Sequence, residues 1–332
     1  MNYDRKGNGH GKPRRSLDIC EDPILDQALK PLWQYINRKT TVEVFVNEPC
    51  RVIVDERGGG KQFYDDSHLT IGYFKKLMSA LSNNAGLQFT PDHPSLSTTL
   101  PFKHRFQGVV GPSLPQEISV AIRCKHPFKA LYEDFGLSGR PLEYLLDLVR
   151  QERTIVIAGS TNTGKTTLLN LLLKEANRER RIITMEDTEE LDTDHFKDRV
   201  TLLAARDENN AAPGKLSYRQ LYDHCMRASP QLIVFGEIST QNAFAALGLL
   251  NTGHRGMIMT IHADTPEQVI RRKFTQNVAW SGRERMDDIP EYLRDMVDLV
   301  VQIKRRSDGM RVVTDMWEPA NDNWILKNGV AA

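Results

Sequence analysis

The sequence contains few cysteines, and none is placed to form a metal-binding pair. Its 332 residues include four scattered cysteines, with no C-x-x-C motif and no His/Cys spacing typical of zinc: Cys20, Cys50, Cys124 and Cys225. Neither a disulfide framework nor a zinc module is therefore expected. The pattern favours reduced thiols in a cytosolic protein.

Long apolar runs are absent as well. No stretch of about 18 apolar residues occurs, so no transmembrane helix is predicted. The opening segment, MNYDRKGNGHGKPRRSLDIC, lacks the apolar core of a signal peptide. We therefore expect a cytoplasmic chain, and any contact with a membrane is expected to be peripheral.

Neither sign of charge is in clear excess. Lys and Arg number 44 against 43 Asp and Glu, which gives a net charge of +1. A surface that binds polyanions as a whole is therefore disfavoured, although local basic patches remain compatible with this balance. The length and the 40% apolar composition are sufficient for two domains with separate cores.

The first part of the chain divides into a tail and an α+β domain. Residues 1–21 are rich in Gly, Lys and Arg, which predicts a disordered basic tail. Residues 22–125 contain two helical patterns, the second one capped by Ser67, and several alternating segments typical of strands. Residues 126–140 are interpreted as a linker.

Residues 141–332 form the second predicted domain. Apolar strand-like segments alternate with helical ones from TIVIAG to GMIMTIHA, which predicts an α/β fold with a parallel sheet covered on both faces. Near the end, Asp308-Gly309 lies between two alternating segments and predicts an antiparallel hairpin added to that sheet.

A phosphate-binding motif follows the first strand of this domain. The segment GSTNTGKTT fits G-x-x-x-x-G-K-S/T between a strand and a helix. Its residues are predicted to cradle nucleotide phosphates: Gly159, Ser160, Thr161, Asn162, Thr163, Gly164, Lys165, Thr166 and Thr167. Lys165 is expected to reach the β- and γ-phosphates, and the Thr166 hydroxyl to bind Mg²⁺.

Two acidic segments follow later strands of the sheet. Glu186 and Asp187 end one strand, where carboxylates would point toward bound phosphates; solvated loop acids are the alternative. In QLIVFGEIST, Gly236 stands where many ATPases have an aspartate that holds Mg²⁺. Glu237 next to it can orient or deprotonate the attacking water, or can instead cap the next helix.

Two histidines flank the last strand of the alternating series, in NTGHRGMIMTIHADTP. Because His254 and His262 belong to one short segment, a functional site is favoured over two structural histidines. Zinc is disfavoured, since no cysteine accompanies them. Either imidazole could sense or bind a γ-phosphate.

Taken together, these motifs resemble those of the secretion ATPase superfamily, most closely its type IV secretion and conjugative-transfer branch. The resemblance covers residues 22–320 or so, through a phosphate loop, an Asp box, a Walker B segment and a His box in that order. It implies a RecA-like C-terminal domain, a PAS-like N-terminal domain and ATP between them. It also implies a hexameric ring, peripheral to the cytoplasmic face of the inner membrane, that works with other secretion ATPases and inner-membrane components to power pilus assembly and translocation.

The resemblance also assigns site residues. It implies that Glu186 and Glu237 arrange water and metal, with Thr166 and Glu186 as the metal contacts, and that His262 is the His-box histidine. Arg105 and Arg123 match the arginines that the family's N-terminal domain offers to the nucleotide. Interdomain or surface arginines are the alternative for these two.

Three departures from the family pattern predict altered turnover or subunit contacts. Ser239 and Ser229 replace arginines, and Lys103 replaces a glycine. A nucleotide-gated scaffold without turnover is therefore one alternative. Others are a type IV pilus or type II secretion assembly ATPase, and a helicase, which the charge balance disfavours.

Overall fold

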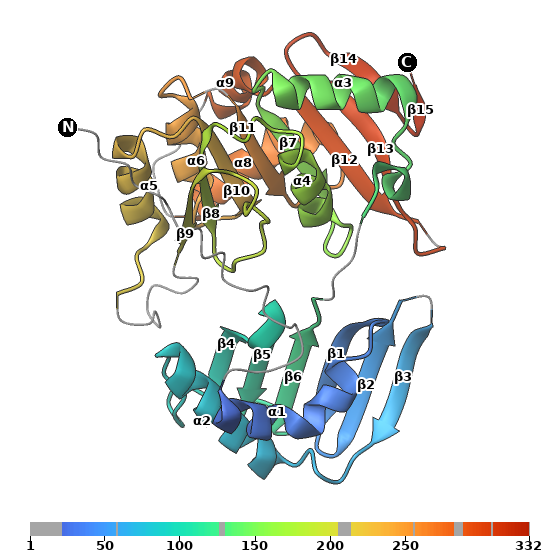
Figure 1. Cartoon of the computed structure of the whole chain (residues 1–332), viewed down its shortest axis with the longest axis vertical. Coiled ribbons are helices and arrows are strands. Elements are labelled where there is room, and N and C mark those ends of the chain that lie inside the picture. The colour runs from blue at the N-terminus through green and yellow to red at the C-terminus, as the bar shows by residue number, and fades with distance from the viewer. Residues whose placement is uncertain are drawn as a thin grey trace, which may run out of the picture. The chain divides into compact units, whose positions relative to one another are not determined.

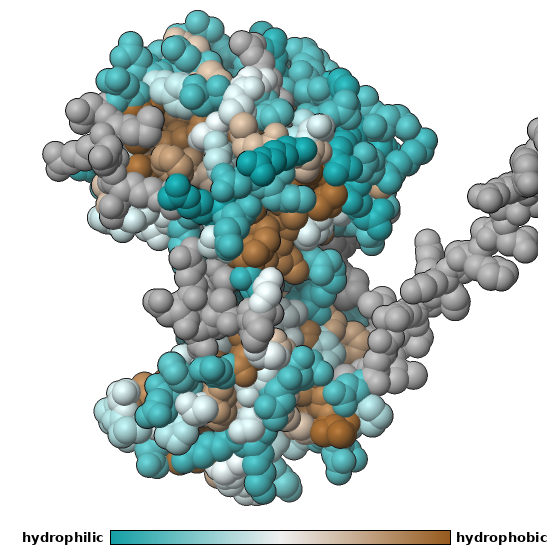
Figure 2. Space-filling model, turned by 90° about the vertical axis from the view of Figure 1, so that its left-hand side faces the viewer, coloured by the Kyte–Doolittle hydropathy of each residue, from teal (hydrophilic) through white to brown (hydrophobic). Residues whose placement is uncertain are grey.

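The computed structural model describes residues 22–57, 59–125, 130–204, 214–254, 256–281, 288–306 and 308–331. The chain divides into two compact units, residues 1–126 and 127–332 (Figure 1). The predicted basic tail, residues 1–21, lies outside the described residues. Hydrophilic residues dominate the visible face of each unit, with hydrophobic residues in smaller groups (Figure 2). Within the described part of the chain, no helix is both long enough and apolar enough to cross a membrane.

The first unit is a six-stranded antiparallel sheet with helices on one face. The strand order is β3-β2-β1-β6-β5-β4. The strands are β1 (Thr41–Glu48), β2 (Arg51–Glu56), β3 (Gly60–Asp65), β4 (Ser95–Thr99), β5 (Arg105–Val110) and β6 (Ile118–Arg123). The helices are α1 (Pro23–Ile36), α2 (Ile71–Ala85) and the short η1 (Pro101–Lys103). Alternate strand residues such as Val44 and Val46 pack against Leu29 of α1 and Phe74 of α2, so the period-two pattern places the core on one face.

Helix α2 begins later than the sequence predicted. Its N-cap is Thr70, whose side chain accepts a hydrogen bond from Tyr73 N, whereas Ser67 was expected to cap it. The preceding residues form a turn instead, because Asp66 accepts the His68 amide through its side chain and the Leu69 amide through its carbonyl. The predicted cap was therefore wrong by three residues, although the helix itself was predicted.

Lys103 has the backbone conformation of a glycine. Its φ is 62°, in the left-handed region, at the position where the family resemblance predicts glycine. Lys103→Gly is therefore expected to raise the free energy of unfolding by about 1 kcal/mol, because glycine adopts this φ without steric cost. Denaturant unfolding measures the change.

The matched control is Lys76→Gly, on the exposed side of α2. The same substitution should there lower the free energy of unfolding by about 0.5–1 kcal/mol, since glycine is a poor helix former. Changes of the same sign at both positions would contradict the backbone argument.

The second unit is built on a nine-stranded sheet. The strand order is β15-β14-β13-β12-β7-β11-β10-β8-β9, parallel from β12 to β9 and antiparallel from β12 to β15. The strands are β7 (Ile155–Gly159), β8 (Arg181–Glu186), β9 (Asp198–Leu203), β10 (Leu232–Ile238), β11 (Met257–Ile261), β12 (Leu299–Arg305), β13 (Arg311–Glu318), β14 (Asn323–Lys327) and β15 (Val330–Ala331). The α/β class and the antiparallel hairpin between β12 and β13 are as predicted.

Helices cover both faces of this sheet (Figure 1). The helical segments are η2 (Tyr132–Phe135), α3 (Gly139–Arg150), α4 (Lys165–Leu173), α5 (Tyr218–Arg227), α6 (Ala243–Leu250), α7 (Pro266–Gln268), the π-helical η4 (Val269–Lys273), α8 (Phe274–Trp280) and α9 (Ile289–Met296). Helices α3 and α4 pack on one face, and α5, α6, α8 and α9 pack on the other. Because both faces are covered, the central strands are apolar throughout, as in β7, whose five residues are all buried.

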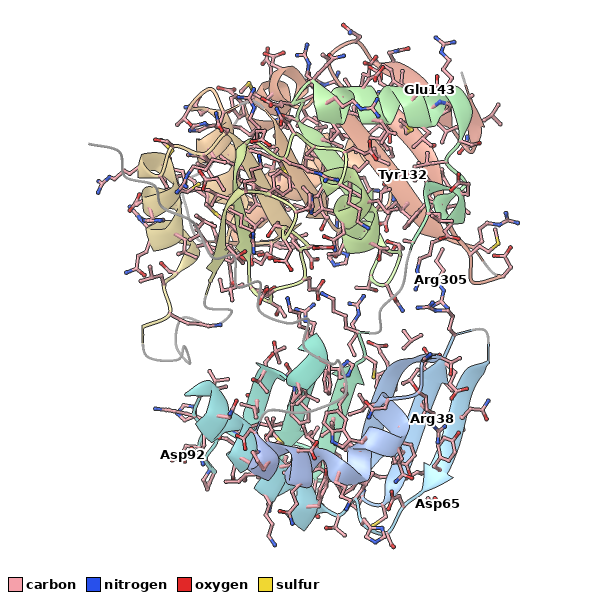
Figure 3. The ribbon with its side chains drawn as sticks, viewed as in Figure 1. Arg38, Asp65, Asp92, Tyr132, Glu143 and Arg305 are labelled. Atoms are coloured by element: carbon pink, nitrogen blue, oxygen red, sulfur yellow. The ribbon has the colours of Figure 1, made fainter. Side chains whose placement is uncertain are left out.

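Residues 130–140, which make up most of the predicted linker 126–140, contribute to the core of this unit. Ala130, Phe135 and Leu137 are buried there. Tyr132, labelled in Figure 3, donates a hydrogen bond of 3.0 Å to the Leu171 carbonyl of α4. The ordered part of the unit therefore starts before residue 141.

Candidate active site

Four predicted segments meet at one edge of the second sheet. Strands β7, β11, β10 and β8 are parallel neighbours in that order, so their carboxyl ends share an edge. The phosphate loop follows β7, His262 follows β11, Glu237 lies near the end of β10, and Glu186 ends β8. The topology therefore brings together residues that are far apart in the sequence.

The phosphate loop has a backbone that its glycines permit. A Cβ on Gly159 would lie 2.6 Å from both Ile303 O and Thr163 Oγ1, so only glycine fits there. Gly164, with φ 93°, precedes the first residue of α4, and the Thr163 hydroxyl donates to Ser160 O at 2.9 Å. The loop thus leads directly into a helix N-terminus, which favours bound anions.

Lys165 is folded back onto this loop. Its Nζ donates to Gly159 O at 3.1 Å and Ser160 O at 3.0 Å, and lies 3.3 Å from His262 Nδ1. The residue is only 7% exposed. The ammonium is therefore held by groups that phosphate oxygens can replace.

His262 connects Lys165 to Glu237. Its Nδ1 faces the ammonium and its Nε2 lies against Glu237 Oε1. A proton on Nε2 satisfies both contacts, because the ammonium can only donate and the carboxylate accepts. The contacts thus run along the edge in the order of the strands, from β7 to β11 to β10.

Gly236 makes room for Glu186. A Cβ at position 236 would lie 3.1 Å from Glu186 Cγ, and the Gly236 carbonyl accepts a 2.6 Å hydrogen bond from the Thr260 hydroxyl. The space where other ATPases place an aspartate is therefore occupied by a carboxylate that comes from the neighbouring strand.

Glu186 is a buried acid with one unused oxygen. It is 2% exposed, and its Oε1 accepts hydrogen bonds from the amides of Glu190 and Leu191 at 2.9 and 3.0 Å. Among the residues that the structure describes, Oε2 has no hydrogen-bond partner. Burial raises the pKa of Glu186 to about 7, although the two amides act in the opposite direction. An orphaned buried carboxylate oxygen fits a site that receives a cation or a metal-bound water.

This pKa predicts how stability depends on pH. Between its ordinary value of 4.5 and about 7, Glu186 binds a proton in the folded state more often than in the unfolded state. The contribution of Glu186 to stability is therefore present below about pH 4.5 and is lost as the pH rises toward 7, by on the order of 3 kcal/mol. Glu186→Gln cannot lose a proton, so its free energy of unfolding should lack this fall with rising pH. The variant should therefore gain stability relative to the parent between about pH 5 and pH 8.

Denaturant unfolding of metal-free protein in EDTA at the two pH values tests this expectation. Glu179→Gln is the control, since Glu179 is exposed in a surface ion pair with Lys197. A constant difference between Glu186→Gln and the parent at both pH values would refute the assignment.

Arg311 is a loop contact that sequence reasoning missed. From the start of β13, its Nε donates to Asn162 O and its Nη2 to Asn162 Oδ1, both at 3.3 Å. Asn162 itself has a φ of 59°, in the left-handed region. The antiparallel hairpin thus supports the strained apex of the phosphate loop. The Asp308-Gly309 turn was the only sequence signal that placed Arg311 at a hairpin end.

The two histidines are not brought together. His254 precedes β11 and His262 follows it, so they lie at opposite ends of a strand of five residues, which spans about 17 Å. The interpretation of both as one site is therefore wrong, and only His262 belongs to the edge described above. Across the described residues, no three His, Cys, Asp or Glu side chains are grouped to hold a metal ion.

The departures from the family pattern are accommodated locally. Ser239 caps the turn after β10, since its hydroxyl accepts the Gln241 amide at 3.3 Å. Ser229 is exposed with a φ of 52°, and Gln231 accepts the Arg181 amide through its side chain. Neither Ser239 nor Ser229 carries a charge.

Arg105 and Arg123 lie in the first unit. They are direct partners on the neighbouring strands β5 and β6, so their side chains leave the same face of the sheet. Glu43 on β1 is the next partner in that row. Burial raises the pKa of Glu43, and Arg123 acts in the opposite direction.

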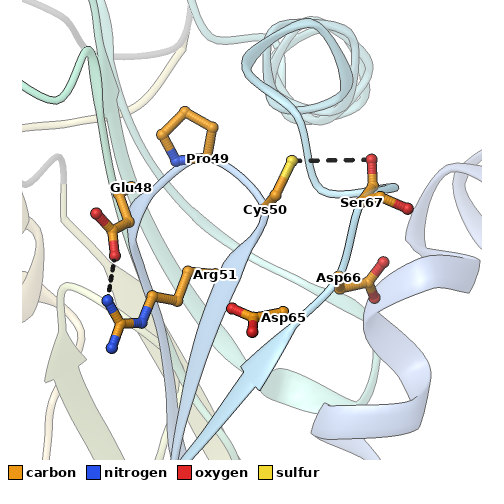
Figure 4. A pocket seen from close by; sticks show the side chains of 7 residues that line it. All are labelled: Glu48, Pro49, Cys50, Arg51, Asp65, Asp66 and Ser67. Carbon is orange, nitrogen blue, oxygen red and sulfur yellow. Dashed lines mark hydrogen bonds and ion pairs between the residues drawn. The ribbon is translucent and has the colours of Figure 1, made fainter.

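A hollow in the first unit contains none of the predicted site residues. It lies beside the β1–β2 turn and the end of β3 (Figure 4), and its lining residues are Glu48, Pro49, Cys50, Arg51, Asp65, Asp66 and Ser67. Three carboxylates would repel phosphate there, and Arg51 already pairs with Glu48 at 2.7 Å. This hollow is therefore unsuited to a nucleotide.

The fold and the contacts from the phosphate loop through Lys165 and His262 to Glu237 define a P-loop nucleotide hydrolase. Comparison with known proteins narrows this class. A family model described as "Type II/IV secretion system protein" matches residues 28–283, and the chain belongs to this family. It is thus a secretion ATPase, an ATP hydrolase, as the motifs predicted.

Individual relatives agree with this assignment. The type IV secretion system protein PtlH of Bordetella pertussis is 27% identical, over 88% of this chain and 94% of its own. VirB11 of Brucella suis biovar 1 is 28% identical, over 90% of this chain and 91% of its own. The crystal structure of the pilus retraction motor PilT with bound ADP has a TM-score of 0.59 at 18% identity, covering 89% of this chain and 82% of that one, which is a likeness of fold.

Proposed function

We propose that this chain forms a homo-hexameric ring that hydrolyses ATP with Mg²⁺ and powers type IV secretion. The row Lys165, His262, Glu237 beside the phosphate loop carries the catalytic part of the proposal. The likeness to PtlH and VirB11 over about nine-tenths of the chain supports the secretion part. Such a ring would be peripheral to the cytoplasmic face of the inner membrane, with other secretion ATPases and inner-membrane components as partners.

The described contacts suggest how each residue acts. Phosphate oxygens of ATP compete for the Lys165 ammonium, which the loop carbonyls hold in the described structure. Thr166 and the orphaned Oε2 of Glu186 would hold Mg²⁺, whose charge offsets that of the phosphates. Glu237 would take the proton of the water whose oxygen bonds to the γ-phosphorus, while the bond to the bridging oxygen breaks and ADP leaves.

The first unit would contribute Arg105 and Arg123. Two guanidinium groups on one face of β5 and β6 match what is needed to neutralise charge that grows on the γ-phosphoryl group. Their position relative to the phosphate loop is part of the proposal.

Phosphate release by the purified protein, with Mg²⁺ or with EDTA, tests the enzyme. We expect release that requires Mg²⁺ and is lost in Lys165→Ala together with ATP binding.

Mass measurement and electron microscopy with ATP test the ring, for which six-fold particles are expected. A monomeric mass with ATP present would contradict the ring, and salt-sensitive single-strand binding that stimulates hydrolysis would favour a helicase instead.

A further inference from the structure

A fully buried amide lies directly behind Glu237. Asn242 is 0% exposed and occupies the N-cap position of α6, where an asparagine usually accepts a hydrogen bond from the first turn of its own helix. Its side chain makes no such bond. Instead it turns back to the end of β10, donating from Nδ2 to Glu237 O and accepting the Ser239 amide at Oδ1, both at 2.7 Å.

A buried tyrosine from another helix joins this amide. Tyr218 of α5 is 6% exposed, and its hydroxyl interacts with the Asn242 side chain. Burial is the main cause that raises the pKa of Tyr218, and the charges of Asp187, Glu186 and Glu237 add to it. Helices α5 and α6 pack against each other on one face of the sheet, and α6 lies next to β10 (Figure 1).

Sheet pairing alone would leave the backbone at Glu237 free to move, and the Asn242 side chain restricts it. Glu237 follows Gly236, which can adopt many conformations, and the pairing of β10 with β11 shifts register between Phe235 and Ile238. Sheet pairing is therefore irregular at the residue whose carboxylate must meet His262. The Asn242 side chain supplies hydrogen bonds on both sides of Ile238, one to Glu237 inside the irregular part of the pairing and one from Ser239 just past the end of β10.

We propose that Asn242, supported by Tyr218, is a positioning residue that fixes the backbone at Glu237 and thereby aims its carboxylate at His262 and the attacking water. The inference rests on the proposed role of Glu237. It also accounts for Ser239, because a turn held by Asn242 and by the Ser239 hydroxyl requires no charged side chain at that position.

The test uses full-length protein and compares variants at three positions. Asn242→Asp keeps the size and the acceptor for Ser239 but removes the Nδ2 donor. It should lower kcat for ATP hydrolysis by about 10- to 100-fold, as misplacement of a reacting group does, with the Kd of ATP changed less than about threefold. Tyr218→Phe removes only the hydroxyl and should lower kcat severalfold. Asn251→Asp, at the exposed C-cap of α6, is the matched control and should keep the parental kcat.

A merely structural role is separated by a double-variant cycle. If Asn242 acts through Glu237, Asn242→Asp should cause no further loss in a Glu237→Gln background. An equal loss in both backgrounds, or a loss that follows the fraction of unfolded protein, would overturn the proposal. If Asn242→Asp keeps the parental kcat while Glu237→Gln is inactive, the role of Asn242 is overturned and that of Glu237 stands. If Glu237→Gln keeps the parental kcat, the role of Glu237 itself is overturned.

Discussion

Glu237→Gln is expected to lower kcat for ATP hydrolysis by about 10²- to 10⁴-fold, the range that a positioned general base contributes. Glutamine keeps the shape of the side chain and a hydrogen-bond acceptor for His262, but it cannot take a proton from water. Binding of ATP should persist, because the contacts of Lys165 and the phosphate loop are unchanged. Steady-state phosphate release and equilibrium nucleotide binding measure the two effects separately.

Glu267→Gln is the matched control. Glu267 is partly exposed on α7, five residues after His262, and the same substitution there should leave kcat unchanged. Equal activities of the two variants would remove Glu237 from the chemistry, and the water would then require another base.

Alanine at Arg105 or Arg123 is expected to lower kcat by about 10³-fold or more, as the loss of an arginine finger does in other phosphoryl-transfer enzymes. The effect should fall on kcat more than on the Kd of ATP, because the charge that a guanidinium neutralises grows during the reaction. Lysine should restore only part of the rate, since an ammonium lacks the planar fork of donors. Single-turnover hydrolysis by the assembled protein is the appropriate measurement.

Arg51→Ala controls for the loss of any arginine from the first unit. Arg51 is exposed and forms a surface ion pair with Glu48, so its loss should change neither kcat nor stability by a large amount. If both Arg105→Ala and Arg123→Ala hydrolyse ATP at the parental rate, these two arginines take no part in hydrolysis.

The sequence was sufficient to predict the parts of the fold that depend on local patterns. Apolar segments such as residues 155–159 became buried central strands, and the phosphate loop lies between a strand and a helix as its motif requires. The order of strands in the sheet was not predicted. It decides which residues meet, and it places His262 between Lys165 and Glu237.

The remaining errors have physical causes. Ser67 is as good a cap as Thr70 by residue type, but the hydrogen bonds of Asp66 hold His68 and Leu69 in a turn, so the helix starts after Thr70. Arg311 could not be linked to Asn162 from sequence, because 149 residues separate them and only the hairpin brings them together. The sequence left the role of His254 open, and strand β11 places it at the opposite end from His262 because closeness in sequence is not closeness in space across an extended strand.

The contact between Gly236 and Glu186 has a consequence for how these positions can vary. A Cβ at position 236 would lie 3.1 Å from Glu186 Cγ, so Gly236→Asp alone would require the Glu186 side chain to move. Shortening residue 186 at the same time would transfer the acid from β8 to β10, at the same edge of the sheet. Substitutions at positions 186 and 236 are therefore expected to depend on each other, because the Glu186 side chain lies where a side chain at position 236 would begin.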